Sequence, residues 1–213
     1  MKILSLNQFN EKLKANQISL SDLKDTIVHK YHPKTKDELK QIIEKRIKNE
    51  GPKCNLNDID VSNITDMSKL FETSNFDGDI SKWNVSNVKD MSDMFFKSKF
   101  NGDISRWDVS KVTYMYGMFC GAKKFDGDIS KWNVSNVTNM SGMFLDSNFN
   151  GDISNWNVSN VTNMSGMFLD SNFNGDISNW NVSKITDMTD MFLNCPLENN
   201  PPEWYISSII AKP

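Results

Sequence analysis

Few residues in this chain are of the types that carry out catalysis or hold a metal ion. Its two histidines, His29 and His32, lie near the start of the chain, and no nucleophile pattern accompanies them. The three cysteines, Cys54, Cys120 and Cys195, are odd in number and widely spaced, which fits neither a disulfide framework nor a zinc site. We expect them to be buried free thiols. The sequence therefore predicts no enzyme, no cofactor and no metal site built from histidine or cysteine.

Aspartate recurs at one position of a repeated pattern, as Asp79, Asp103, Asp128, Asp152 and Asp176. Outward carboxylates stacked about 5 Å apart would repel one another by roughly 1 kcal/mol per pair in water. Each aspartate could offset this by accepting hydrogen bonds from turn N–H groups and from nearby serine or asparagine. Alternatively, the column could bind Ca²⁺, which takes about six to eight oxygen ligands. One carboxylate per repeat is a small supply of ligands, so we favour the turn.

Basic and aromatic side chains interrupt the polar pattern of several repeats. Lys82, Arg106 and Lys131 share the position before tryptophan, where they form either a solvated face that offsets the aspartates or a patch for an acidic partner. Tyr114 and Tyr116 replace the asparagine and serine of other repeats, and exposed tyrosine is favoured at protein interfaces. These five residues are the binding candidates, and we expect Arg106 to share one recognition surface with the two tyrosines.

A fixed repeat positions the aspartates, the basic residues and the tyrosines. Successive tryptophans are 24, 25, 24, 24 and 24 residues apart. They are Trp83, Trp107, Trp132, Trp156, Trp180 and Trp204. Self-similarity at such a period indicates stacked structural units, because one unit alone cannot bury its own apolar side chains. We therefore expect the tryptophans to stack inside one continuous column.

Apolar spacing changes along a single repeat, as residues 149–172 show. The first residues alternate at period two, which indicates a half-buried strand. Met164, Met167 and Phe168 then follow the i, i+3, i+4 spacing of a short helix. The glycine that follows Asn or Asp at the start of each repeat is typical of a turn. The sequence predicts a β-rich solenoid in which each repeat contributes short strands and a short helix or turn.

Three segments follow from this pattern. Residues 1–50 carry no repeat, and we expect them to form a helical N-terminal cap, including a helix over residues 21–30 and another after the capping box Thr35–Glu38. A competing interpretation is that this segment binds a partner through a pair of helices. Residues 51–200 are expected to form the solenoid, with about six turns. Residues 201–213 leave the pattern and are expected to form a C-terminal cap.

Residues 152–168 carry the pattern D-I-S-x-W-[ND]-V-S-x-V-x-x-M-x-x-M-F, which recurs in five consecutive units. This pattern resembles the BspA-like leucine-rich-repeat surface proteins of bacteria, in their variant with 24–25 residues per repeat. Residues 34–39 and 58–60 also resemble the usual N-terminal unit of that family, so the resemblance covers about residues 33–195. It implies a β-rich solenoid related to leucine-rich repeats, adhesion to host or partner proteins, and no catalysis.

Charge and hydropathy limit the possible partners and locations. The 213 residues carry a formal net charge of −3, which argues against nucleic-acid binding. No apolar run approaches the roughly 18 residues of a membrane span. The first residues lack the apolar core of a secretory signal, which favours the cytoplasm, whereas the resemblance implies the cell surface or secretion.

These observations predict a non-enzymatic repeat scaffold that binds another protein, with surface adhesion or host interaction as the role that the resemblance implies. Two alternatives remain open. The chain could be an intracellular protein that neutralises or tethers a partner, or it could be a carbohydrate-binding module, since stacked polar ladders can face glycans. We expect a monomer with a protein partner and no small-molecule ligand.

Overall fold

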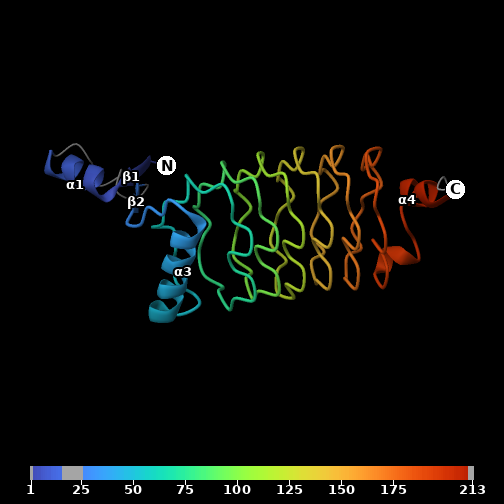
Figure 1. The fold of residues 1–213 in the computed structure, drawn as a ribbon, viewed down its shortest axis with the longest axis horizontal. Coiled ribbons are helices and arrows are strands. Elements are labelled where there is room, and N and C mark those ends of the chain that lie inside the picture. Colours follow the sequence, from blue (N-terminus) through green and yellow to red (C-terminus); the bar gives the residue numbers. More distant parts are fainter. Residues whose placement is uncertain (1, 16–25, 211–213) are drawn as a thin grey trace.

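The computed structural model describes residues 2–15 and 26–210, and its regular elements lie near the two ends of the chain (Figure 1). Strand β1 (Lys2–Ser5), helix α1 (Leu6–Lys14), strand β2 (Thr26–His29) and helix α3 (Lys36–Glu50) precede the repeats, and a 3₁₀ helix (Pro196–Glu198) and helix α4 (Glu203–Ile210) follow them. Strands β1 and β2 form a two-stranded parallel sheet, with Lys2 paired to Thr26 and Ser5 to His29.

Residues 52–195 form six coils that stack along the long axis of the molecule (Figure 1). Neighbouring coils are joined at one position by a single parallel bridge, and the residues at this position are Asp66, Asp90, Tyr114, Asn139, Asn163 and Asp187. No residue between 51 and 195 lies in a helix or in a strand longer than such a bridge. The predicted β-rich solenoid, with strands and a helix or turn in each repeat, is therefore wrong, because the coils consist of turns.

Each coil turns at three corners, and these share one construction except at the third corner of the coil that carries Tyr114. An Asp or Asn oxygen accepts the N–H of the residue two positions later, and the apolar residue between them begins a β-turn. In residues 149–172 the accepting residues are Asp152, Asn157 and Asn163, at N···O distances of 2.9, 3.2 and 2.9 Å. The β-turns run from Ile153 to Trp156, from Val158 to Val161 and from Met164 to Met167. We call these the first, second and third corners.

The helical spacing of Met164, Met167 and Phe168 belongs to the third corner and not to a helix. Gly166 and Asp170 have φ values of 58° and 56°, in the left-handed region that interrupts an α-helix. The N–H groups of Met164, Gly166 and Phe168 donate to carbonyl groups of the next coil at 2.9, 2.8 and 3.0 Å. In a helix, these N–H groups would donate to carbonyl groups of the same coil. The turns are favoured because they leave the N–H groups free to bond the neighbouring coil.

Aromatic rings stack in register through the whole column. The centroids of consecutive phenylalanine rings at the third corner are 5.5 to 6.0 Å apart, and these residues are Phe71, Phe95, Phe119, Phe144, Phe168 and Phe192. The tryptophans from Trp83 to Trp180 are only 3–4% exposed, which confirms that their column is buried. The Trp156 indole Nε1 also donates to the carbonyl of Ile129 in the preceding coil at 3.1 Å. Tryptophan therefore fills the core and joins adjacent coils.

Helix α3 covers the start of the stack. The Thr35 hydroxyl oxygen accepts the N–H of Glu38 at 3.2 Å, as the capping box predicts. Leu39 and Ile43 are 0% and 2% exposed and belong to the same core as the coils. The helix ends at Gly51, whose N–H donates to the carbonyl of Ile47. This helix closes the apolar end of the column against water.

Strand β2 leads directly into the stack. Beyond it, Tyr31 forms a parallel bridge with Ile59 in the first coil. The helix expected over residues 21–30 is wrong for Thr26–His29, which pairs with β1. Residues 21–25 lie outside the described residues. A strand is favoured over a helix here, because the backbone hydrogen bonds of the sheet continue the parallel pairing of the coils.

The 3₁₀ helix and helix α4 cover part of the other end. The Trp204 ring lies 6.5 Å from that of Trp180, and its indole Nε1 donates to the carbonyl of Ile177 at 2.9 Å. The Tyr205 ring meets the Phe192 ring edge-on at 4.7 Å. The aromatic side of the last coil is therefore covered.

Candidate functional site

The aspartates of the first corner cap turns. One carboxylate oxygen of Asp79, Asp103, Asp128, Asp152 and Asp176 accepts the N–H of the serine two residues later, each at 2.9 Å. This confirms the expectation that turn N–H groups stabilise the column. Within residues 2–15 and 26–210, no group of three or more His, Cys, Asp or Glu side chains is arranged to hold a metal ion.

The same hydrogen bonds favour the ionised carboxylates. The Ser130 hydroxyl, and then the Ser130 N–H, lower the pKa of Asp128. Ser154 lowers the pKa of Asp152 in the same way. Asp93 differs, because burial raises its pKa. Hydrogen bonds are thus the largest contribution to the charged form of Asp128 and Asp152.

Acid is expected to destabilise the stack. A carboxylate whose pKa is lower in the folded state contributes stability that is complete above its unfolded pKa of about 4 and is lost as the pH falls through the folded value. The free energy of unfolding, measured with urea, should therefore be constant near neutral pH and fall below about pH 4. Asp103→Asn/Asp128→Asn/Asp152→Asn is the control, because Asn caps the same kind of turn at Asn157 and Asn163 without titrating. Equal acid sensitivity of this variant and the natural chain would contradict the assignment.

The three basic candidates lie at the first corner. Lys82, Arg106 and Lys131 are exposed and immediately precede the buried tryptophans. Each is close enough to an aspartate of the same coil to favour its charged form, as Arg106 does for Asp103. The cations therefore offset part of the charge of these aspartates, and the patch for an acidic partner stays a prediction.

The two tyrosines lie at the third corner and not beside the cations. Tyr114 and Tyr116 are 50% and 48% exposed, while Met115 between them is fully buried. The carbonyl groups of Tyr114 and Tyr116 accept the N–H groups of Met91 and Asp93 at 2.9 and 2.7 Å. The backbone under both rings is therefore fixed by the preceding coil. The structure does not bring Arg106 and the tyrosines to one corner of the coil.

This corner lacks the side-chain cap of its neighbours. In the coil before it, Asp90 accepts the N–H of Ser92 at 2.8 Å, and in the coil after it, Asn139 accepts the N–H of Ser141 at 2.9 Å. Tyrosine has no oxygen that can reach its own backbone in this way. The coil thus lacks one local capping hydrogen bond and carries two outward aromatic rings instead. Short polar side chains flank these rings on both sides.

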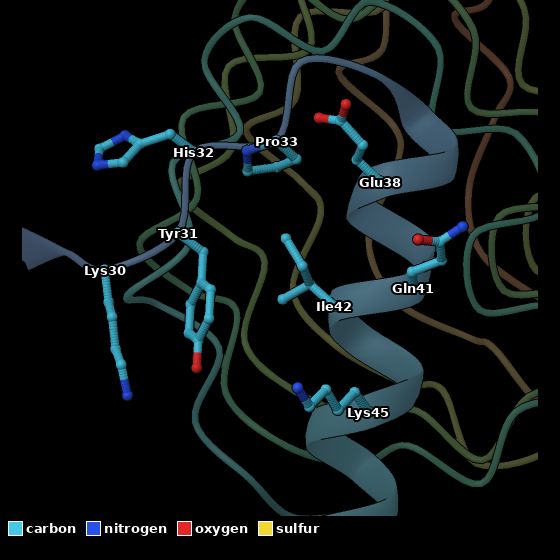
Figure 2. A pocket seen from close by; sticks show the side chains of 8 residues that line it. All are labelled: Lys30, Tyr31, His32, Pro33, Glu38, Gln41, Ile42 and Lys45. Carbon is cyan, nitrogen blue, oxygen red and sulfur yellow. The ribbon is translucent and has the colours of Figure 1, made fainter.

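A second candidate lies where the segment after β2 passes beside helix α3 (Figure 2). The open pocket there has a volume of about 440 Å³. Tyr31 and Ile42 face each other across it. The Lys30 ammonium and the Arg46 guanidinium lie 5.3 and 5.5 Å from the centre of the Tyr31 ring. Sequence reasoning missed this pocket, because its walls come from two segments without a shared motif.

Both histidines lie near one carboxylate at this end. The Nδ1 atoms of His29 and His32 are 3.8 and 3.4 Å from the same oxygen of Asp60, whose other oxygen accepts the Ser62 hydroxyl. Burial lowers the pKa of His29. The Asp60 N–H also donates to the carbonyl of Tyr31. This cluster therefore attaches the N-terminal segment to the first coil.

The cysteines are free in the described part of the chain. Cys54 and Cys195 are buried as expected, while Cys120 is only partly buried. Burial is the largest cause that raises the pKa of all three thiols. A thiol with a raised pKa is a poor nucleophile at neutral pH. The cysteines are thus packing residues.

Comparison with known proteins assigns the chain to a protein family. The family model described as "Mycoplasma protein of unknown function, DUF285" matches residues 38–148 and again residues 128–211. The chain belongs to this family. The two DUF285 matches together span most of α3, all six coils and α4. No curated protein and no solved structure matches the chain. None of the helices in residues 2–15 and 26–210 has the length and apolar character needed to cross a bilayer.

Proposed function

We propose that this DUF285 chain is a non-enzymatic repeat scaffold that binds another protein, with Tyr114 and Tyr116 at the centre of the contact. The observation that carries the proposal is the half-exposure of these two rings at a corner where neighbouring coils carry a polar cap. Tyrosine is enriched at protein interfaces, because its ring can be buried while its hydroxyl group forms a hydrogen bond. The placement of the two rings on outward positions of a stacked coil supports a recognition role.

The physical basis of such a contact is rigidity. Both residues flank the buried Met115, and their carbonyl groups are held by hydrogen bonds from the preceding coil. Tyrosine has few rotatable bonds, so fixing it against a partner costs little conformational entropy. A surface that is already ordered loses less freedom on binding and gains affinity accordingly. The tyrosine pair is therefore a suitable centre for a protein interface.

The resemblance to BspA-like surface proteins supports adhesion to host or partner proteins as the biological role. The alternative is an intracellular role in neutralising or tethering a partner. Fractionation of the source cells distinguishes this role from adhesion. Carbohydrate binding is the second candidate, because two exposed aromatic rings on a polar surface can also pack against sugar rings. A glycan array probed with the intact chain separates this candidate from protein binding.

The double variant Tyr114→Asn/Tyr116→Ser tests the site, because it restores the residues that other coils carry at these positions. It should remain folded and lower the affinity for the captured protein partner at least tenfold, which corresponds to about 1.4 kcal/mol. The partner is isolated by pull-down with the natural chain, and both affinities are measured by calorimetry.

Arg106→Asn is the matched control, since Asn155 and Asn179 occupy the same position in later coils. We expect it to change the affinity less than threefold, roughly. Undiminished binding by the tyrosine variant, or a larger loss with Arg106→Asn, would contradict the proposed surface and favour the first-corner cations.

A further inference from the structure

Every internal boundary between coils uses the same backbone pairing at the third corner. At the last boundary, the N–H groups of Met164 and Gly166 donate to the carbonyl groups of Asp187 and Thr189 at 2.9 and 2.8 Å. In return, the Thr162 carbonyl accepts the N–H and the hydroxyl of Thr186. In each coil, N–H groups two residues apart therefore donate hydrogen bonds to the coil that follows.

The last coil, residues 173–195, carries the same groups, and the residues that follow it up to 210 form no further coil. In the described part of the chain, the N–H groups of Met188 and Asp190 donate no hydrogen bond and the Thr186 carbonyl accepts none. Farther along the coil, the Asn194 N–H is taken by the Glu198 carboxylate at 2.8 Å. The C-terminal elements thus cover one part of this end and leave the N–H groups of Met188 and Asp190 and the carbonyl of Thr186 without a backbone partner among the described residues.

Apolar side chains beside this edge are incompletely covered. Val182 and Ile185 are partly buried, whereas their counterparts one coil earlier, Val158 and Val161, are 1% and 0% exposed. Leu193 is 41% exposed at the same end. Unpaired backbone groups next to an apolar strip are what an added extended segment needs for hydrogen bonding and side-chain packing.

We propose that residues 186–190 bind an extended segment of a partner protein, which pairs in parallel with them and places apolar side chains on Val182 and Ile185. The boundaries between coils within this chain show that the geometry supports such pairing. The exposed acidic side chain of Asp190 favours a segment that carries Lys or Arg beside its apolar residues. This edge is separate from the tyrosine pair.

A second copy of the chain fits the edge less well. The first coil of a second copy is covered by its own helix α3, whose Leu39 and Ile43 are buried against the core. Two last coils facing each other would bring the N–H groups of Met188 and Asp190 against their equivalents, donor against donor. An extended segment can present carbonyl groups two residues apart without first displacing helix α3, whose Lys36 ammonium bonds the side chains of Asp66 and Ser68 in the first coil.

The test titrates a defined peptide into the full chain labelled with ¹⁵N. The probe is the N-acetylated, C-amidated sequence of residues 158–168, VSNVTNMSGMF, extended by two lysines. We expect the amide signals of Met188 and Asp190 to shift and their hydrogen exchange to slow at least fivefold, while Met164 and Gly166 stay unchanged. A peptide of the same composition in scrambled order should leave these signals in place.

Ile185→Lys should weaken peptide binding at least tenfold, because a charge then stands where apolar side chains pack. Asn179→Lys is the matched control, since it adds the same charge in the same coil at a position that holds Lys82 and Lys131 in earlier coils. Tyr114→Asn/Tyr116→Ser should bind the peptide like the natural chain, so failure of the two proposals is distinguishable. Absence of shifts at millimolar peptide, equal binding of both peptides, or concentration-dependent shifts without peptide would overturn the proposal.

Discussion

Replacing Phe144 with alanine is expected to lower the free energy of unfolding by about 3–5 kcal/mol. The side chain is fully buried in the middle of the stack. Its ring centroid lies 5.8 Å from those of Phe119 and Phe168 and 4.4 Å from that of Phe149. The cavity cannot collapse easily, because the coils on both sides are fixed by backbone hydrogen bonds. Urea unfolding followed by tryptophan fluorescence measures the loss.

Tyr205→Ala provides the comparison at the end of the stack. Its ring packs on Phe192 in the last coil and is partly exposed. We expect a loss clearly smaller than that of Phe144→Ala. If the two variants lost the same stability, the aromatic column would not be the main source of cohesion between coils.

Gly78→Ala is expected to destabilise the chain by about 1–3 kcal/mol more than Gly127→Ala, although both residues occupy the same position in the repeat. A Cβ atom at position 78 would lie 2.1 Å from the carbonyl oxygen of Cys54 and 2.6 Å from the Phe76 ring. At position 127 the nearest atom, in the Phe125 ring, would be 3.1 Å away. The Cys54 carbonyl is backbone and cannot rotate aside, so the first coil must move.

The difference in stability between Gly78→Ala and Gly127→Ala is measured from their melting temperatures and urea midpoints. Neither glycine has a positive φ, so left-handed strain contributes to neither measurement. The turn expected from the Asp-Gly pairs is therefore not the reason for glycine here. Glycine is required because the phenylalanine ring two residues earlier and the preceding coil approach the backbone closely. Equal losses in the two variants would show that the close contact at Cys54 relaxes without cost.

The side chains that are buried could be predicted from the period of the repeat alone. Trp156, Met164 and Phe168 recur with every coil, and they are 3%, 0% and 0% exposed. An apolar residue that returns at a fixed interval must point inward in every unit, because each unit buries its face against the next. The same reasoning located Tyr114 and Tyr116 outside, since they replace polar residues at outward positions.

Backbone conformation could not be predicted in the same way. The spacing of Met164, Met167 and Phe168 fits one turn of helix and also fits consecutive β-turns. Local sequence does not separate the two, because the difference lies in where the N–H groups donate. The carbonyl groups of the next coil decide it, and they become available only after stacking.

The relation between candidate residues also depended on the fold. Arg106 and Tyr114 are eight positions apart, which says nothing about which corner of a coil each occupies. The second corner, between Val109 and Val112, turns the chain between them. The proposed recognition surface therefore includes the two tyrosines without Arg106, which lies beside the aspartates of the first corner.

By itself, the sequence determined the repeat, the buried columns, the turn-capping aspartates and the helix that begins after Thr35. It could do so because each depends on residue type and spacing within one or two units. Only the tertiary structure decided three features: the coils consist of turns, the indoles donate hydrogen bonds to the preceding coil, and the N–H groups of Met188 and Asp190 have no backbone partner among the described residues. These features depend on hydrogen bonds between segments about 24 residues apart, which exist only when one coil lies on another.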